Sequence, residues 1–361
     1  MFKRVDPVRC SRAFFLLLLL AAPACGGLGE SPSSQAPARS PAIAAAPTST
    51  PSGVVTIAAV GDIMLARDLT TLMDAHGALY PFERVLPLLQ NADLTIANME
   101  GAFTERGAAS AKLYTFRTPP RFAAGLPQAG IDAVSLGNNH SADFGPEGVQ
   151  DTLAALDAAG VSHAGAGMND AAARQPALLQ AQGLRIAFLS YTDVMENTFA
   201  GPDSAGVALA TPDLIAAGVR AAKSQADVVI VALHSGVEYT DAPQADQQRL
   251  AHAAIDAGAL LVLGTHPHAL QGSIRYHGGL IIYSMGNFVF DLDADDLANL
   301  GPRAFQTAVF YITIDAHQVR DLRVEPVFID PAEDRPRPPT IEEAAAIRDH
   351  IAAVDRLAGE P

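Results

Sequence analysis

Cysteine is almost missing from this chain of 361 residues, and its scarcity excludes several kinds of site. The two cysteines, Cys10 and Cys25, both lie close to the N-terminus. Residues 26–361 therefore have no thiolate metal ligand, no cysteine nucleophile and no disulfide bond among themselves. Tryptophan is absent altogether, and charged residues make up 17% of the chain, below the usual quarter.

Positive charge is also scarce. Lys and Arg number 24 against 39 Asp and Glu, which gives a formal net charge of −15. Proteins that bind nucleic acid need a basic surface to neutralise phosphates, so we expect no nucleic-acid partner. The overall field does not attract anions either, and an anionic substrate would need a metal ion or an arginine at its binding site. Hydrophobic residues make up 49% of the chain, enough for a large core.

The first 24 residues have the pattern of a signal peptide. The apolar run at residues 14–22 is too short to span a membrane. It follows four basic residues, Lys3, Arg4, Arg9 and Arg12. Small residues precede Cys25, as in bacterial lipoproteins, although Ala22 stands where such signals usually have Leu. We expect an exported protein of the cell envelope, anchored to the membrane through lipidated Cys25. Cleavage by an ordinary signal peptidase is the alternative.

Three further segments follow the signal peptide. Residues 25–53 are rich in Ser, Pro, Ala and Thr without apolar periodicity, which predicts a disordered tether. Residues 54–330 have the patterns of a folded domain. Residues 331–361 begin with a Pro- and charge-rich linker and continue into a helix at 341–357, which either packs on the domain or forms a loosely held tail.

Residues 54–330 alternate short apolar runs with amphipathic segments, which is typical of a layered α/β sheet. The expected strands are 54–60, 93–97, 131–136, 184–190, 227–233 and 259–263. The expected helices are 81–90, 122–129, 146–160, 211–224 and 244–258. A hairpin (273–276 and 280–284) and two longer strands (305–314 and 319–328) complete the domain.

Five of the expected strands end at side chains that can bind a metal ion. These side chains are Asp62, Glu100, Asn139, His234, His266 and His268. Ligands bind at the carboxyl ends of strands in α/β sheets, and mixed oxygen and imidazole donors suit Zn, Mn or Fe. Pro267 excludes a helix between the last two histidines, and an extended chain lets both face one ion. The alternative is that Asp62 only caps a helix and the histidines are loop residues without a function.

Six motifs in order resemble the bacterial capsule-synthesis CapA family, which is linked to poly-γ-glutamate production. They are Gly61-Asp62-Ile63-Met64 with Arg67, Asn98-Met99-Glu100-Gly101, Gly137-Asn138-Asn139-His140 with Asp143 and Gly145, His234-Ser235-Gly236-Val237-Glu238-Tyr239, His266-Pro267-His268 with Gln271, and Tyr283-Ser284-Met285-Gly286-Asn287-Phe288. The resemblance covers roughly residues 54–330. The family is in turn similar to calcineurin-like metallophosphoesterases. That similarity implies a four-layer α-β-β-α sandwich, an α/β fold in which one or two divalent metal ions lie at strand ends.

The similarity also implies a role for each matching position. Asp62, Asn139, His234, His266 and His268 match metal ligands of the phosphoesterases, and His140 matches their general acid. Glu100 stands near the place of their bridging aspartate, and we assign it as a longer carboxylate substitute.

Two positions depart from the related motifs. Met64 stands where the phosphoesterases have a histidine ligand, and Met is a poor ligand for a hard divalent ion. One of the two metals is therefore expected to be weakly held or absent. Ser235 stands where the capsule family usually has Trp, which would alter the wall of the pocket.

Two functions stay open at this point. The first is a metal-dependent hydrolase acting on a phosphoester or on an anionic γ-glutamyl polymer. His140 would protonate the leaving group and Arg67 would hold an anionic group. The second is a non-catalytic, membrane-tethered binding or scaffold subunit of a membrane-bound polymer synthase or exporter. The intact histidines favour the enzyme, and Met64 favours the scaffold.

Overall fold

Two β-sheets form the centre of the protein in the computed structural model, which describes residues 53–194, 199–292 and 294–359. The expected signal peptide, Cys25 and all but the last residue of the expected tether lie outside the described residues. Within the described ranges, no helix has both the length and the apolar character needed to cross a bilayer.

The first sheet has the strand order β18-β17-β16-β1-β2-β5-β6. Four of these strands are parallel: β1 (Val55–Ile63), β2 (Leu94–Met99), β5 (Ala133–Ser135) and β6 (Ser162–Ala164). Three strands continue the sheet antiparallel to their neighbours: β16 (Gln306–Ile314), β17 (Val319–Asp330) and β18 (Arg335–Arg337). A short strand, β15 (Asn287–Val289), also pairs with β1 near its end.

The second sheet has the order β13-β14-β12-β11-β9-β8. Its inner strands are parallel: β9 (Leu184–Thr192), β11 (Val228–His234), β12 (Leu261–Thr265) and β14 (Gly279–Met285). The edge strands β8 (Ala177–Ala181) and β13 (Leu270–Tyr276) run antiparallel to their neighbours. Two small ribbons, β3–β4 (Ala102–Phe103 with Arg117–Thr118) and β7–β10 (Ala166–Gly167 with Gly206–Val207), lie apart from the two large sheets.

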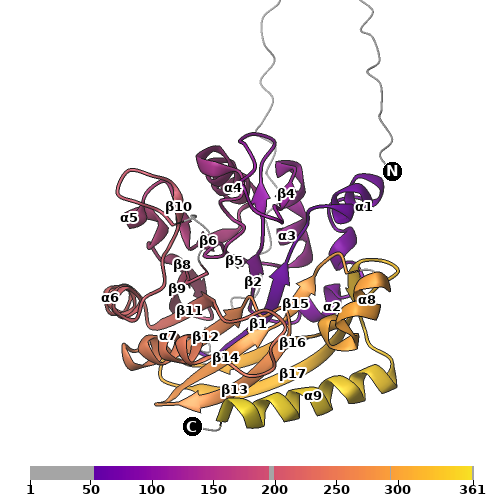
Figure 1. Ribbon diagram of the computed structural model, residues 1–361. Helices are drawn as coiled ribbons and strands as arrows, with labels where there is room; N and C mark the ends of the chain where they lie inside the picture. The colour runs from indigo at the N-terminus through magenta and orange to yellow at the C-terminus, as the bar shows by residue number, and fades with distance from the viewer. Residues whose placement is uncertain (1–52, 195–198, 293, 360–361) are drawn as a thin grey trace, which may run out of the picture. The chain divides into compact units, whose positions relative to one another are not determined.

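Three apolar cores show that the sheets pack face to face with helices outside. Along β1, Ile57 and Ala59 belong to the core shared by both sheets, whereas Ala58 and Val60 belong to a core with helices. The helices beside the first sheet are α1 (Asp68–His76), α2 (Leu86–Leu89), α3 (Gly125–Ala129) and α4 (Gly145–Ala159). Those beside the second sheet are α6 (Pro212–Ala222) and α7 (Ala245–Asp256). The order helix, sheet, sheet, helix confirms the predicted four-layer α-β-β-α sandwich (Figure 1).

Local sequence signals set several helix ends as expected. Thr211 caps α6, since its Oγ1 accepts a hydrogen bond from the Leu214 amide at 3.2 Å. Gly160 ends α4 in the left-handed region at φ 75°. A four-residue helix, α5 (Asp170–Ala173), and α8 (Ala294–Leu300) were not expected.

Two predicted helices are broken, and a proline explains each break. The segment expected at 81–90 is a 3₁₀ turn (Tyr80–Phe82) followed by α2, and the one expected at 122–129 is a 3₁₀ turn (Pro120–Ala124) followed by α3. Pro87 and Pro127 cannot donate the hydrogen bond that a continuous α-helix needs, and their rings clash with the carbonyl four residues earlier.

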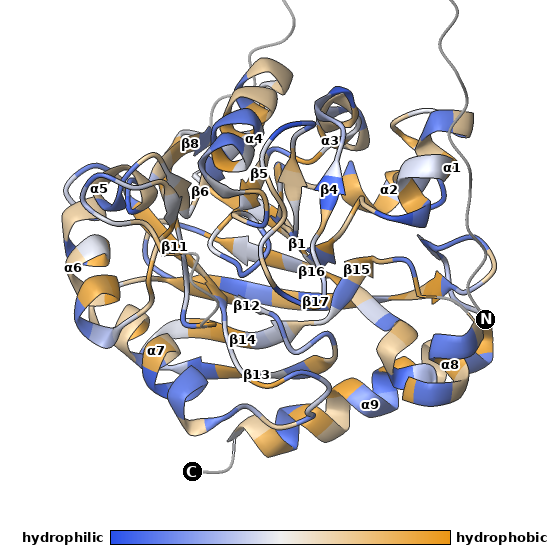
Figure 2. Cartoon of the chain, turned by 45° about the horizontal axis from the view of Figure 1, so that its top comes forward, coloured by the Kyte–Doolittle hydropathy of each residue, from blue (hydrophilic) through white to orange (hydrophobic). Residues whose placement is uncertain are grey.

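The C-terminal helix α9 (Ile341–Gly359) packs on β13 rather than hanging free. The Ser273 amide on β13 donates a hydrogen bond to Asp355 Oδ1 on α9 at 2.7 Å, and Ile347 belongs to the core of the sheets. Figure 2 shows hydrophobic and hydrophilic stretches alternating along α9. The residues expected as a linker also contain β18, which pairs with β17.

Candidate metal centre

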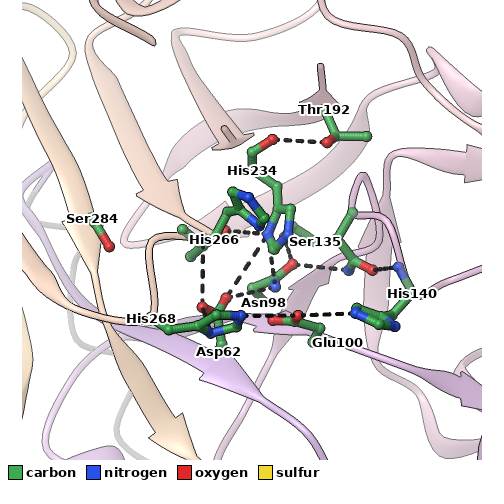
Figure 3. Close-up of polar contacts among 12 residues, drawn as sticks. Asp62, Asn98, Glu100, Ser135, His140, Thr192, His234, His266, His268 and Ser284 are labelled. Atoms are coloured by element: carbon green, nitrogen blue, oxygen red, sulfur yellow. Dashed lines mark hydrogen bonds and ion pairs between the residues drawn. The ribbon is translucent and has the colours of Figure 1, made fainter. Parts of the chain in front are cut away.

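The carboxyl ends of five strands bring the predicted donors together. Asp62 lies at the end of β1 and His234 at the end of β11. Glu100 follows β2 directly and His266 follows β12 directly, whereas Asn139 lies four residues beyond β5 and His268 three residues beyond β12. Figure 3 shows most of these side chains pointing toward one another across the two sheets. The structure thus brings all six predicted side chains to one edge of the sandwich, while their role as metal ligands stays a prediction.

Asp62 is fully buried and anchored by its neighbours. Gly61 before it leaves no room for a side chain, since a Cβ there would lie 1.8 Å from the Gly286 carbonyl oxygen. That closeness lets the Asp62 amide donate to the same oxygen at 2.9 Å. The Asp62 carboxylate accepts a hydrogen bond from Asn98 Nδ2 at 2.8 Å, and its other oxygen lies 3.4 Å from His268 Nδ1. Asp62 is thus held in place by both backbone and side chain.

Asn98 is a site residue to which the sequence analysis gave no role. Its Oδ1 accepts hydrogen bonds from Ser135 Oγ at 2.6 Å and Asn138 Nδ2 at 3.1 Å, while its Nδ2 reaches Asp62. Asn138 Oδ1 in turn accepts from the His140 amide at 3.0 Å, which shapes the turn after β5. Asn98 therefore ties the ends of β1, β2 and β5 together. The signal available in the sequence was its position: Asn98 directly follows the expected strand 93–97 and stands two positions before Glu100.

Glu100 is the most unusual group of the site. Both of its carboxylate oxygens are buried, and neither accepts a hydrogen bond from any residue that the structure describes. The nearest basic atoms are Nε2 of His268 at 3.7 Å and Nε2 of His140 at 3.8 Å. Burial, followed by the charge of Asp62, raises the pKa of Glu100 well above its usual range. A buried carboxylate is unfavourable without a proton or a cation beside it.

His234 and Asn139 present donor atoms to the same point. His234 Nε2 lies 2.8 Å from Asn139 Oδ1, and His234 Nδ1 lies 3.0 Å from Thr265 Oγ1. Burial, followed by the nearby His266 and the other basic groups, lowers the pKa of His234 well below its usual range. The ring is therefore neutral, which is the state that binds a metal ion.

His266 and His268 both have positive φ angles, 96° and 54°. Non-glycine residues rarely adopt this backbone conformation, and such residues cluster at functional sites. His268 Nδ1 lies 2.8 Å from Asn287 Oδ1, close to Asp62, while its Nε2 faces Glu100. Burial opposes protonation of His268, but Glu100 and Asp62 outweigh it and raise its pKa to about 10. A protonated His268 thus supplies the positive charge that a bound ion would otherwise bring.

His140 is oriented by an acidic partner beside the carboxylates. Its Nδ1 lies 2.8 Å from Asp143 Oδ2, and the other oxygen of Asp143 contacts Lys112 Nζ at 2.6 Å. The Phe116 ring packs against the imidazole with centroids 4.1 Å apart, and the Phe116 amide donates to Asp143 at 2.7 Å. Burial lowers the pKa of His140 against the opposing effect of Asp143. This arrangement leaves Nε2 facing Glu100.

Arg67 lies at the mouth of the site rather than inside it. Its Nε contacts Asp291 Oδ2 at 2.9 Å, and 47% of its side chain is exposed. Burial raises the pKa of Asp291 to about 7, against the opposing effect of Arg67. Arg67 and Asp291 line a cavity of about 310 Å³ that also reaches His140 and His268. The predicted anion-binding role of Arg67 is therefore compatible with where its side chain lies.

Met64 takes no part in the donor cluster. Its side chain is fully buried in the core between the sheets, and its Sδ accepts a hydrogen bond from the Ala66 amide at 3.1 Å. Ser235, at the position expected to alter the pocket wall, is buried, and its amide donates to the Thr265 carbonyl at 3.1 Å.

The donor set fits a divalent ion. Two groups have ligand atoms that lie within 4.8 Å of one another: Asp62, Glu100 and His234, and Glu238, His266 and His268. Carboxylate oxygens and imidazole nitrogens without thiolates suit Zn, Mn or Fe. The buried carboxylate of Glu100, which accepts no hydrogen bond from the described residues, is an independent sign of the same fit. Glu238 was quoted within a motif but was not assigned as a ligand.

Comparison with known proteins adds a family match. The family described as bacterial capsule synthesis protein PGA_cap matches residues 56–292. The capsule biosynthesis protein CapA of Bacillus anthracis is 33% identical over 246 residues, covering 66% of this chain and 60% of that protein. The PGA biosynthesis protein CapA of Bacillus subtilis (strain 168) is 34% identical over 242 residues, covering 66% and 64%. The match thus spans less than two thirds of the length of either relative.

Comparison with solved structures also finds similar chains. A putative 5'-nucleotidase from Staphylococcus aureus, solved in complex with alpha-ketoglutarate, aligns with a TM-score of 0.48 at 14% identity. The alignment covers 83% of this chain and 58% of the nucleotidase.

Proposed function

Because this chain belongs to the bacterial capsule synthesis family PGA_cap, we propose that it acts in the synthesis of a cell-surface polymer of the poly-γ-glutamate kind. Its donor cluster is a hydrolytic metal site in this proposal. The names of the two Bacillus relatives, which refer to capsule and PGA biosynthesis, support a role in the synthesis of such a polymer. The substrate is a phosphoester or a γ-linked glutamyl polymer, both of which are anionic.

The carboxylate of Glu100 is the observation that carries the metal site. It is buried without a hydrogen-bond partner among the described residues and lies 3.7 Å from His268, which also contacts Asp62. A bound divalent ion supplies Lewis-acid polarisation of the scissile group and lowers the pKa of a water molecule. Asp62, Glu100, Asn139, His234, His266 and His268 would hold the ion, and no thiolate competes with them.

The side chains around the cluster supply the rest of the chemistry. Asp143 holds His140 through Nδ1, so that Nε2 can deliver a proton to the leaving group. Lys112 neutralises the second oxygen of Asp143, and Phe116 covers the ring from one side. Arg67 at the cavity mouth binds an anionic group of the substrate by exchanging part of its contact with Asp291.

The location that suits this activity is the cell envelope. Export through the N-terminal signal and anchoring through lipidated Cys25 would place the site beside a membrane-bound polymer synthase or exporter. The spacing of basic, apolar and small residues before Cys25 supports this placement.

One observation favours a second function, a scaffold subunit without catalysis. Met64 is buried between the sheets with its sulfur engaged, so one expected ligand is missing. A scaffold of this kind would bind polymer or synthase and keep at most a structural ion. It would hydrolyse neither substrate class when fully loaded with metal.

Metal analysis and hydrolysis assays together test the proposal. The purified chain, reconstituted with Mn, Fe or Zn, should retain at least one ion, and His266→Ala should lower that content. His252→Ala is the matched control, because His252 on α7 stacks on Tyr276 and contacts Tyr283 away from the cluster. Absence of metal from the wild type after reconstitution would contradict the metal site. If the protein holds its full complement of metal but hydrolyses neither phosphoesters nor γ-glutamyl chains, the hydrolase function is wrong and the scaffold function is supported.

A further inference from the structure

Glu238 lies in the loop after β11 and faces the histidine pair. One of its carboxylate oxygens and one nitrogen each from His266 and His268 lie within 4.8 Å of one another. Glu238 also lines the 310 Å³ cavity together with His268.

The loop that carries Glu238 is clamped to the histidine turn. The Tyr239 amide donates to the Pro267 carbonyl at 2.7 Å, and the Tyr239 ring lies 5.9 Å from the His268 ring. Gly236 has φ 118°, and a Cβ there would lie 2.9 Å from the Gln247 side chain and 3.3 Å from Pro267. Glu238 is therefore presented to the histidines by a fixed backbone rather than by a freely moving side chain alone.

The first of the two donor groups is complete without Glu238, and the second is not. Asp62, Glu100 and His234 are all buried. Glu238 is the acidic member of the second group, and the position expected to add a ligand holds Met64, whose sulfur accepts a hydrogen bond from the Ala66 amide. Catalytic metal sites commonly have three protein ligands, and Glu238 supplies a third donor beside the two histidines.

We propose that Glu238 is a metal ligand that replaces the histidine absent at position 64. The inference rests on the proposed metal site and adds a second, outer ion held by Glu238, His266 and His268. The inner group is buried, whereas Glu238 is exposed at the cavity, so the outer ion is the one that a substrate would meet. The missing motif position would then mark a relocated ligand rather than a lost metal.

Titration of the purified full chain with Mn²⁺ alone tests the proposal. Equilibrium dialysis with elemental analysis should find two ions on the wild type and one on Glu238→Ala. Substitution of a residue that hydrogen-bonds to a metal ligand lowers metal affinity about 10–100-fold. Loss of Glu238, a ligand itself, should therefore lower the affinity for the outer ion at least ~100-fold. Glu325→Ala is the matched control, because Glu325 is an acidic side chain of β17 that pairs with Arg323. It should keep both ions.

The outcomes separate this inference from the proposed function. One ion on the wild type, unchanged by Glu238→Ala, would overturn the outer site and leave the inner one. Two ions on both proteins with equal affinities would remove Glu238 from the ligand set. No ion on the wild type would reject the metal site itself. Glu238 is exposed, and a circular dichroism spectrum matching the wild type would show that its variant folds.

Discussion

His140 shows how its neighbours set the chemistry of one side chain. Asp143 takes its Nδ1 and Phe116 covers its ring, so the remaining nitrogen is fixed toward Glu100 and the cavity. We expect His140→Ala to lower turnover by ~10²–10⁴-fold, the usual contribution of a general acid. Metal content should stay unchanged, because His140 belongs to neither donor group. Steady-state kinetics and elemental analysis on the same preparation measure both quantities.

Arg67→Ala is the informative comparison for that experiment. Loss of a charge-assisted contact should raise KM more than it lowers kcat, since Arg67 lies at the cavity mouth. Turnover of His140→Ala equal to that of the wild type would remove the general-acid role, whatever happens at Arg67.

The sequence predicted most donors because strand ends follow a simple rule. Polar residues directly after apolar runs meet at the carboxyl edge of parallel strands, as Asp62 and His234 do. Glu238 was quoted within a motif but given no role, because only the conformation of its loop decides whether its side chain faces the histidines. The register of β1 against β2 shifts between Ala59 and Asp62, and such irregularities aim side chains in ways that periodicity does not encode.

At the scale of elements, α9 depends on one glycine of β13. A Cβ at Gly272 would lie 2.2 Å from the Val354 carbonyl oxygen and 2.7 Å from the Ala358 Cβ. Backbone atoms cannot give way as a flexible side chain can. Overpacking of this kind costs roughly 1–3 kcal/mol, more than the ~0.4–1 kcal/mol that Gly→Ala gains by restricting the unfolded chain. Gly272→Ala should therefore lower the free energy of unfolding in urea by about 1–2 kcal/mol.

Gly359 offers the matching control, because a Cβ there meets nothing within 4 Å. Gly359→Ala should change stability by less than about 0.5 kcal/mol. Equal effects of the two substitutions would show that α9 does not press on β13 as described.

The buried inner strands were predicted for a physical reason, whereas several short or outer strands, among them β6, β8 and β18, were not expected. An apolar run such as 227–233 matches β11 within one residue, because both faces of an inner parallel strand are buried. The apolar face of residues 81–90 has helical periodicity, but a single proline overrides it. The sequence left the packing of α9 undecided, since the pattern of one helix does not name the surface that it covers.

At the scale of the whole molecule, we expect the N-terminal segment to decide where in the cell the protein is found. We expect wild-type protein in the membrane fraction of a bacterial host that processes lipoproteins. Cys25→Ser should yield soluble or unprocessed protein, because the lipid attachment atom is lost. Fractionation with detection of the chain measures this, and a fully soluble wild type would contradict the lipid anchor. Ordinary signal cleavage would give the same soluble product with or without Cys25.

The donor cluster also has a mechanical meaning for the chain. Asp62, Glu100 and Asn139 follow strands of one sheet, whereas His234, His266 and His268 follow strands of the other. An ion held by both sets would fasten two separate sheets, much as a disulfide fastens two loops. The part of the chain that the structure describes contains no cysteine with which to make such a bond. Chelation would then loosen the sandwich itself, and the amount of available metal would set how long the folded protein survives.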